Sequence, residues 1–140
     1  ALMYLGGDGV TQSHVMAAYW TKLAAEQGHA GAQNNLGLMY YNGDGVAQDY
    51  AVAVKWYTFA AEQGYADAQY SLGAIYAFGG GVLQDYVLAF MWGHIAAVND
   101  NEAGAQVRDF AVREMAKAEI TTAQKMAREC MASNYENCEY

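Results

Sequence analysis

The sequence repeats itself at a spacing of 36 residues, and this period limits the possible folds more than any other feature. The three tryptophans, Trp20, Trp56 and Trp92, are separated by that spacing. Other residues recur in the same register: Tyr4, Tyr40 and Tyr76; Gly7, Gly43 and Gly79; Gly9, Gly45 and Gly81; Val10, Val46 and Val82; and Gln12, Gln48 and Gln84. Such a period indicates a supersecondary unit that stacks on neighbouring copies, because one unit cannot bury its own apolar face.

Each unit is predicted to contain two helices. In the second unit Ala32, Leu36 and Tyr40 stand four residues apart, which places them on one face of a helix. Gly43 is predicted to end this helix, because glycine tolerates the left-handed cap conformation. Asp49 is then placed to cap the start of the second helix.

Small and large residues at fixed repeat positions indicate how the helices pack. Gly37 and Gly73 fall inside the predicted first helices, where glycine costs about 1 kcal/mol relative to alanine. That cost is offset if a neighbouring helix approaches closely at the same point. Trp20, Trp56 and Trp92 are then expected to fill the wider gaps between helices.

The repeated residues resemble the Sel-1-like repeat, a family related to the tetratricopeptide repeats. The resemblance covers residues 1 to about 98 and rests on the pattern Ala32-x3-Leu36-Gly37-x2-Tyr40-x2-Gly43-x-Gly45-Val46-x2-Asp49-x3-Ala53-x2-Trp56-x3-Ala60-Ala61-x2-Gly64-x-Ala66. It implies an all-α fold, a right-handed α-α superhelix (solenoid) in which the first helix of each unit lines a concave face.

The repeat register divides the chain into four segments of one predicted solenoid domain. These segments are a partial first repeat at 1–28, a second repeat at 29–64, a third repeat at 65–100 and C-terminal capping helices at 101–140. Because Ala1 aligns with Gly37, inside a first helix, the parent protein is expected to continue upstream.

The capping segment is predicted to hold two charged helices, at residues 102–116 and 119–132. Its charged residues are expected on a solvated outer face, since solenoids end in polar caps. They are Arg108, Arg113, Lys117, Glu119, Lys125 and Arg128.

Helical geometry predicts a partner-binding surface on the first helices. Since Ala32, Leu36 and Tyr40 define the buried side, the other side is expected to face the concave surface. Its residues are Asn34, Asn35, Leu38 and Tyr41 in the second unit, Tyr70, Ser71, Ala74 and Ala77 in the third, and Leu2 and Leu5 in the first. Exposed tyrosine and leucine beside asparagine suit peptide binding. The alternative is that some of these side chains pack against the next repeat.

Cys130 and Cys138 are the only cysteines, and they flank the predicted end of the last helix. Asn134 is placed to end that helix and to let the tail fold back, so that a disulfide would staple the terminus. An even pair near a terminus suits a periplasmic or secreted protein, and the spacing resembles that of cysteine-rich secreted members of the family. The alternatives are a metal site, for which no histidine lies near in sequence, or two free thiols in a cytoplasmic protein.

Charge and composition argue against several classes of partner. The net charge of −8 repels phosphate backbones, so no nucleic-acid partner is expected. No apolar run approaches the roughly 18 residues of a membrane-spanning helix. His14, His29 and His94 occupy unrelated repeat positions and are not expected to share a metal, and no cofactor is expected.

These features predict a bacterial protein–protein interaction scaffold that binds a peptide or protein on its concave face without catalysis. The resemblance leaves open a cell-wall or β-lactam-related hydrolase, or a penicillin-binding protein, because some relatives have been described in those terms. No serine–lysine motif in this sequence supports that chemistry. A structural spacer within a larger envelope protein is the third hypothesis.

Overall fold

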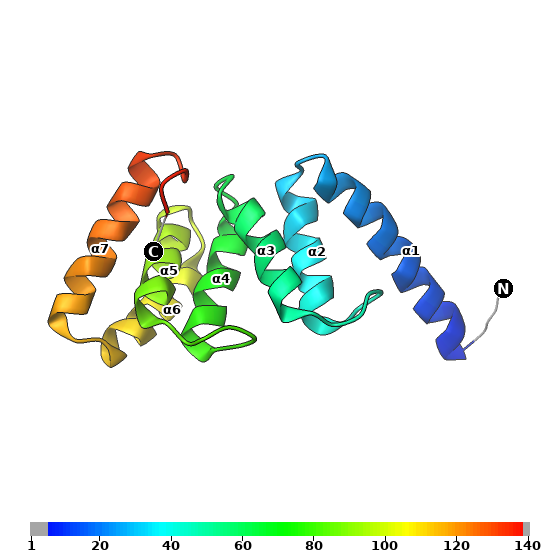
Figure 1. Ribbon diagram of the computed structural model, residues 1–140, viewed down its shortest axis with the longest axis horizontal. Coiled ribbons are helices and arrows are strands. Elements are labelled where there is room, and N and C mark those ends of the chain that lie inside the picture. Colours follow the sequence, from blue (N-terminus) through cyan, green and yellow to red (C-terminus); the bar gives the residue numbers. More distant parts are fainter. Residues whose placement is uncertain (1–5, 139–140) are drawn as a thin grey trace. The chain divides into compact units, whose positions relative to one another are not determined.

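The computed structural model describes residues 6–138, and within that range it contains seven helices and no strand (Figure 1). The helices are α1 (Gly6–Glu26), α2 (Ala30–Asn42), α3 (Tyr50–Ala61), α4 (Ala66–Phe78), α5 (Tyr86–Val98), α6 (Glu102–Glu114) and α7 (Lys117–Ala132). The prediction of an all-α fold is confirmed, and α6 and α7 lie where the two capping helices were expected.

The helices belong to two compact units, residues 1–56 and 57–140. In the first unit α1 packs against α2. In the second unit α5 packs against α4, α6 and α7, and α4 also contacts α6. The larger apolar core therefore lies in the second unit, around α5.

Glycine ends the first helix of two repeats, as the sequence predicts. Gly43 follows α2 with φ of 70°, and Gly79 follows α4 with the same φ, in the left-handed region that favours glycine. Gly45 has a second reason to be glycine. A Cβ at this position would overlap the backbone carbonyl of His14 on α1.

Aspartate caps the following helix in both repeats. The Asp49 carboxylate accepts a hydrogen bond from the Val52 amide at 3.1 Å, and the Asp49 amide donates to the Tyr40 carbonyl at 2.9 Å. Asp85 makes the same two kinds of bond before α5, at 3.0 and 2.9 Å. The predicted cap at Asp49 is confirmed, and the capping bonds recur with the 36-residue period.

The first unit departs from the repeat at its start. Helix α1 runs without a break through Gly7 and Gly9, where the register predicts a loop. Glycine inside a helix costs about 1 kcal/mol, so these glycines permit a break without enforcing one. In the second repeat the loop is closed by a hydrogen bond to the Tyr40 carbonyl. The residue at the same position of the first repeat, Tyr4, lies outside the described residues.

The three tryptophans differ in burial, which corrects the expectation that all of them fill interhelical gaps. Trp92 is 0% exposed, Trp56 is half-buried and Trp20 is 61% exposed. The difference follows from the number of neighbours. Trp92 lies on α5, which is surrounded by three helices, whereas Trp20 lies on α1, whose partner in the first unit is α2.

Helices α4, α5 and α6 of the second unit pack closely against one another at glycine residues. A Cβ on Gly73 of α4 would lie 3.0 Å from the backbone nitrogen of Gly93 on α5. A Cβ on Gly93 would lie 2.8 Å from the carbonyl oxygen of Gly104 on α6, and one on Gly104 would lie 2.6 Å from the Cβ of Ala96. The expected close approach at Gly73 is confirmed, and it continues from α5 to α6.

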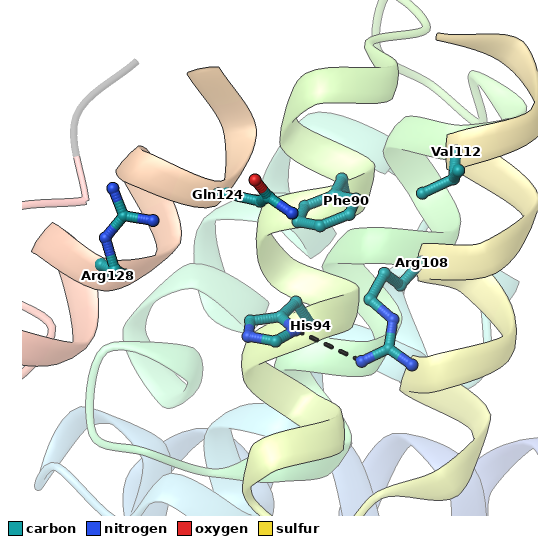
Figure 2. A pocket seen from close by; sticks show the side chains of 6 residues that line it. All are labelled: Phe90, His94, Arg108, Val112, Gln124 and Arg128. Carbon is teal, nitrogen blue, oxygen red and sulfur yellow. Dashed lines mark hydrogen bonds between the residues drawn. The ribbon is translucent and has the colours of Figure 1, made fainter. Parts of the chain in front are cut away.

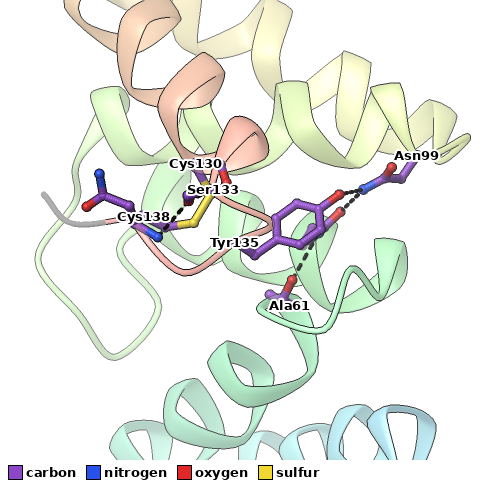
Figure 3. The surroundings of a disulfide bond; sticks show 8 residues. Ala61, Asn99, Cys130, Ser133, Tyr135 and Cys138 are labelled. Carbon is purple, nitrogen blue, oxygen red and sulfur yellow. Dashed lines mark hydrogen bonds between the residues drawn. A yellow bond between two sulfur atoms is a disulfide. The ribbon is translucent and has the colours of Figure 1, made fainter.

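The C-terminal segment folds back on the second unit and is closed by a disulfide between Cys130 and Cys138 (Figure 3). Helix α7 ends at Ala132, and Asn134 and Tyr135 then take φ values of 57° and 68°. These left-handed residues reverse the chain, as expected at Asn134. Both cysteines are buried, at 0% and 7% exposure. The predicted pairing is confirmed.

A chain of polar contacts holds the reversed segment to the rest of the second unit (Figure 3). The Asn99 side-chain amide lies 2.9 Å from the Tyr135 hydroxyl and 2.9 Å from Oε1 of Gln69, and it donates to both. Gln69, which is fully buried, donates in turn to the Ala61 carbonyl at 3.0 Å. A buried amide satisfied in this way fixes the position of its neighbours, because breaking any bond leaves an unpaired polar group. The tail is therefore tied to α3, α4 and the end of α5.

The close approach at Gly104 yields the first prediction. Gly104→Ala should lower the free energy of unfolding by about 1–3 kcal/mol through overpacking, although alanine favours a helix by about 1 kcal/mol. Chemical denaturation followed by circular dichroism measures this change. Combining it with Ala96→Gly removes the nearest clashing atom, so the double variant should lose less stability than the two single losses together. Strict additivity of the two changes would contradict the packing argument.

The disulfide yields the second prediction. The denatured protein should gain one hydrogen at each sulfur on treatment with a thiol reductant, as measured by mass spectrometry. Cys138→Ser should lower the free energy of unfolding by about 2–3 kcal/mol, because the short loop is no longer closed in the unfolded chain. Tyr135→Phe is the matched control for the same segment, since it removes one hydrogen bond and keeps the cross-link. An unchanged mass after reduction would refute the pairing.

Candidate functional site

The α2 part of the expected partner face contains both exposed and packed side chains. Asn35 is exposed, and Leu38 is 49% exposed. Asn34 is half-buried, and its Oδ1 atom has no hydrogen-bond partner among the residues that the structure describes. The Tyr41 ring packs on the Tyr50 ring, with centroids 4.8 Å apart and planes at 55°. Asn35 and Leu38 are thus the most accessible residues of this face.

The α4 part of the same face is more strongly packed. Tyr70 and Ala74 are half-buried against a core cluster that includes Ala89 and Phe90 of α5. The Ser71 hydroxyl is half-buried and donates to the Asp67 carbonyl of its own helix at 3.0 Å.

Two parts of the expected face do not contribute in the described structure. Ala77 is 0% exposed within the core of the second unit, so its expected outward orientation is wrong. The cause is packing against α5, which periodicity within one helix does not reveal. Leu2 and Leu5 lie outside the described residues. The assignment of the remaining residues to a partner stays a prediction.

The three histidines lie in three different settings. His14 Nδ1 is 2.6 Å from an oxygen of Asp44, at a half-exposed surface of the first unit. His29 precedes α2 and makes no side-chain capping bond there. His94 lies in the middle of α5. Within the described chain, no three histidine, cysteine or acidic side chains are grouped closely enough to hold a metal ion.

A groove of about 530 Å³ lies over α5 in the second unit and was not predicted from the sequence (Figure 2). Phe90 and His94 of α5 lie at its centre, and α6 and α7 supply the two sides. Its lining residues are Phe90, His94, Arg108, Val112, Gln124 and Arg128.

Arg108 differs most from its expected position. The side chain was expected on a solvated outer face, but it is only 28% exposed and lies in the groove. Its Nη1 is 3.3 Å from Nδ1 of His94, and its Nε donates to Asp109 at 3.2 Å. The close packing of α6 on α5 explains this, because a Cβ on Gly93 would lie 3.0 Å from the Arg108 backbone nitrogen.

The groove lowers the pKa of His94 below its ordinary value of 6.5. Burial of the imidazole is the larger cause, and the positive charge of Arg108 is the second. A neutral imidazole is the form whose Nδ1 can accept a hydrogen bond from Arg108. The ring also stacks on Phe90, with centroids 5.8 Å apart and planes at 14°. His94 is therefore neutral at pH 7 and orients the guanidinium beside it.

Tyr76 on α4 shows the opposite shift. Burial raises the pKa of its hydroxyl, and the nearby Asp85 carboxylate raises it further. The hydroxyl accordingly stays protonated at physiological pH, when it can act as a hydrogen-bond donor. It has no nucleophilic character under those conditions.

The His94 environment yields the third prediction. In a titration followed by NMR, the His94 ring should show a midpoint below 6.5, and His94→Gln identifies its signal. Arg108→Gln should raise the midpoint toward 6.5 because one of the two causes is removed. Arg113→Gln, which removes an exposed guanidinium from the same helix, is the matched control and should leave the midpoint unchanged. A midpoint at or above 6.5 in the unchanged protein would contradict this account.

None of the helices in residues 6–138 combines the length and the apolar character needed to cross a lipid bilayer.

Comparisons with known proteins identify the repeat. The Sel1 repeat family model matches residues 1–29, 30–65 and 66–100. The chain is similar to the crystal structure of c5321, a protective antigen present in uropathogenic Escherichia coli strains that displays an SLR fold. That match has 34% sequence identity and a TM-score of 0.82, and it covers 87% of this chain and 27% of the antigen.

A second similar structure is a Sel1 repeat protein from Oxalobacter formigenes. It has 37% identity and a TM-score of 0.63, with 65% of this chain and 26% of that protein covered. The chain thus spans about a quarter of the length of both solved relatives. No curated protein matches it. Three consecutive matches to the family model, together with the helix pairs and their capping loops, show that this chain belongs to the Sel1 repeat family.

Proposed function

We propose that this chain is a protein-interaction scaffold that binds a peptide or protein segment and carries out no catalysis itself. The observation that carries the proposal is the accessible pair Asn35 and Leu38 on α2, in a chain of Sel1 repeats. Sel1 repeats commonly serve as protein-interaction scaffolds. Fold alone does not assign function, so the proposal depends on what these side chains can do.

Asn35 and Leu38 supply two complementary kinds of contact. The Leu38 side chain is about half exposed and can bury apolar area against a partner. The Asn35 amide can donate to and accept from the backbone of an extended peptide. They lie three residues apart on one helix, so both face the same direction. Asn34 and Tyr41 are proposed to border this contact.

Helix α4 is proposed to offer a second, weaker contact through Tyr70, Ser71 and Ala74. The half-exposed parts of these side chains are available to a partner, while their buried parts pack against α5. Substitution by alanine at Tyr70 would disturb the core as well as the surface. The α2 residues are therefore the better positions for a test.

The protein is proposed to act outside the cytoplasm. The buried Cys130–Cys138 disulfide supports this, because such bonds persist in oxidising compartments and are rare in the cytosol.

The function is tested by peptide selection, the fourth prediction. Peptides selected from a random library on the 140-residue chain should bind Leu38→Ala at least about fivefold more weakly, since a truncated anchor residue typically costs more than 1 kcal/mol. Asn35→Ala should weaken binding in the same direction. Leu83→Ala is the matched control, because it removes a leucine that is 90% exposed in a loop outside the proposed contact. Melting temperatures should be equal for all three variants.

Three outcomes would each contradict part of this proposal. If the selected peptides bound Leu38→Ala and Leu83→Ala with equal affinity, the proposed α2 contact would be wrong. Hydrolysis of nitrocefin or of peptidoglycan by the purified chain would favour the alternative of a cell-wall or β-lactam-related hydrolase. Failure to select any peptide would favour a structural spacer.

A further inference from the structure

The groove over α5 concentrates positive charge in a protein that is strongly acidic. The whole chain has 15 acidic residues against 7 lysines and arginines. Two of those seven, Arg108 and Arg128, nevertheless line this one groove, and none of its lining residues within the described part of the chain is a carboxylate. Because positive charge is scarce on this chain, two arginines at one concave site favour binding of a negatively charged ligand there.

The two arginines lie on opposite sides of the groove and differ in what they already contact (Figure 2). Arg108 projects from α6, held through Nη1 by His94 and through Nε by Asp109. Arg128 projects from α7, is exposed, and has no ion-pair partner within the described part of the chain. One guanidinium is therefore pre-oriented and the other is free to close on a ligand.

The remaining lining residues favour a carboxylate attached to apolar atoms. Phe90 and Val112 present apolar surface between the charged groups, and the Gln124 amide can donate a further hydrogen bond. Guanidinium groups bind carboxylates through two parallel N–H···O bonds, which suits a planar monoanion. The neutral His94 adds no positive charge, so the site is less suited to a doubly charged phosphate.

The shape of the site favours a chain segment over an enclosed small molecule. Phe90, at the floor, is buried, whereas Gln124 and Arg128, on the α7 side, are exposed. Small-molecule sites usually enclose most of their ligand. A groove with an open side instead accommodates a peptide that enters and leaves along it.

We propose that this groove binds an acidic peptide segment, with carboxylates held by Arg108 and Arg128 and apolar atoms lying on Phe90 and Val112. The inference rests on the proposed scaffold function and assigns it a further contact and a partner chemistry. It involves α5, α6 and α7 and none of the residues proposed on α2 or α4. Either assignment can therefore fail while the other stands.

The test uses the 140-residue chain and a fluorescein-labelled peptide that alternates glutamate and leucine. The corresponding glutamine–leucine peptide is its neutral counterpart. Fluorescence anisotropy should show binding of the acidic peptide and at least about tenfold weaker binding of the neutral one. NMR should place the perturbed amides at Phe90, His94, Arg108, Val112, Gln124 and Arg128. No perturbation there would overturn the proposal.

Matched variants separate this site from the general charge of the protein. Arg128→Gln should weaken binding of the acidic peptide at least about fivefold. Arg108→Gln should also weaken this binding. Arg113→Gln removes the same charge from an exposed position outside the groove and should change affinity by less than about twofold, because exposed charges are screened by salt. An equal loss in Arg113→Gln would overturn the proposal in favour of long-range attraction.

Two further measurements distinguish this groove from a small-molecule site and from the α2 contact. Glutarate should compete only weakly, since it lacks the backbone and apolar atoms of a peptide. Binding of glutarate as tight as that of the peptide would overturn the peptide assignment in favour of a small-molecule site. Leu38→Ala should leave binding of the acidic peptide unchanged. If it abolished that binding, the peptide would occupy the α2 contact and the groove assignment would fall.

Discussion

The close approach of α4, α5 and α6 at three glycines is the constraint on which the second unit depends. Gly73, Gly93 and Gly104 lie where helix backbones approach closely enough that a Cβ would meet a neighbour at 2.6–3.0 Å. Trp92, which lies on α5 between these helices, has no exposed surface. Dense packing transmits such a constraint, because side chains in a close-packed interior cannot shift independently. The same contact brings α6 to the position at which Arg108 reaches His94.

Hydrogen bonds determine where the C-terminal segment lies on the second unit. The small residues along α4 and α5 bury little area each, so they do not alone determine which segment covers the end of the unit. Gln69 and Asn99 do so, because the buried Gln69 amide and the partly buried Asn99 amide require partners, and the Tyr135 hydroxyl is one of them. The disulfide then keeps the segment that carries Tyr135 close to the end of α7. Hydrogen bonds and a disulfide thus hold the segment that covers one end of the apolar core.

The proposed binding surfaces follow from the side chains that this packing leaves accessible. On α2 the accessible pair is Asn35 and Leu38, a neutral surface suited to peptide backbone and apolar side chains. On α5–α7 it is a groove with guanidinium groups on both sides, suited to carboxylates. Repeat proteins bind their partners on extended surfaces of the solenoid, which do not enclose the ligand. Neither surface requires a reactive group.

The period of 36 residues, the two-helix unit, the glycine stops and the aspartate caps could all be predicted from the sequence. The hydrogen bonds of the caps join residues close in the chain, from Asp49 to Val52 and to Tyr40, so residue type and spacing suffice to anticipate them. The disulfide between Cys130 and Cys138 is local in the same sense. The burial of Ala77, the exposure of Trp20 and the groove at His94 depended on which helices surround each residue. Those contacts join side chains that are distant in sequence, and only the packed tertiary structure decides them, because the helical period orders residues within a helix but does not say how many neighbours cover it.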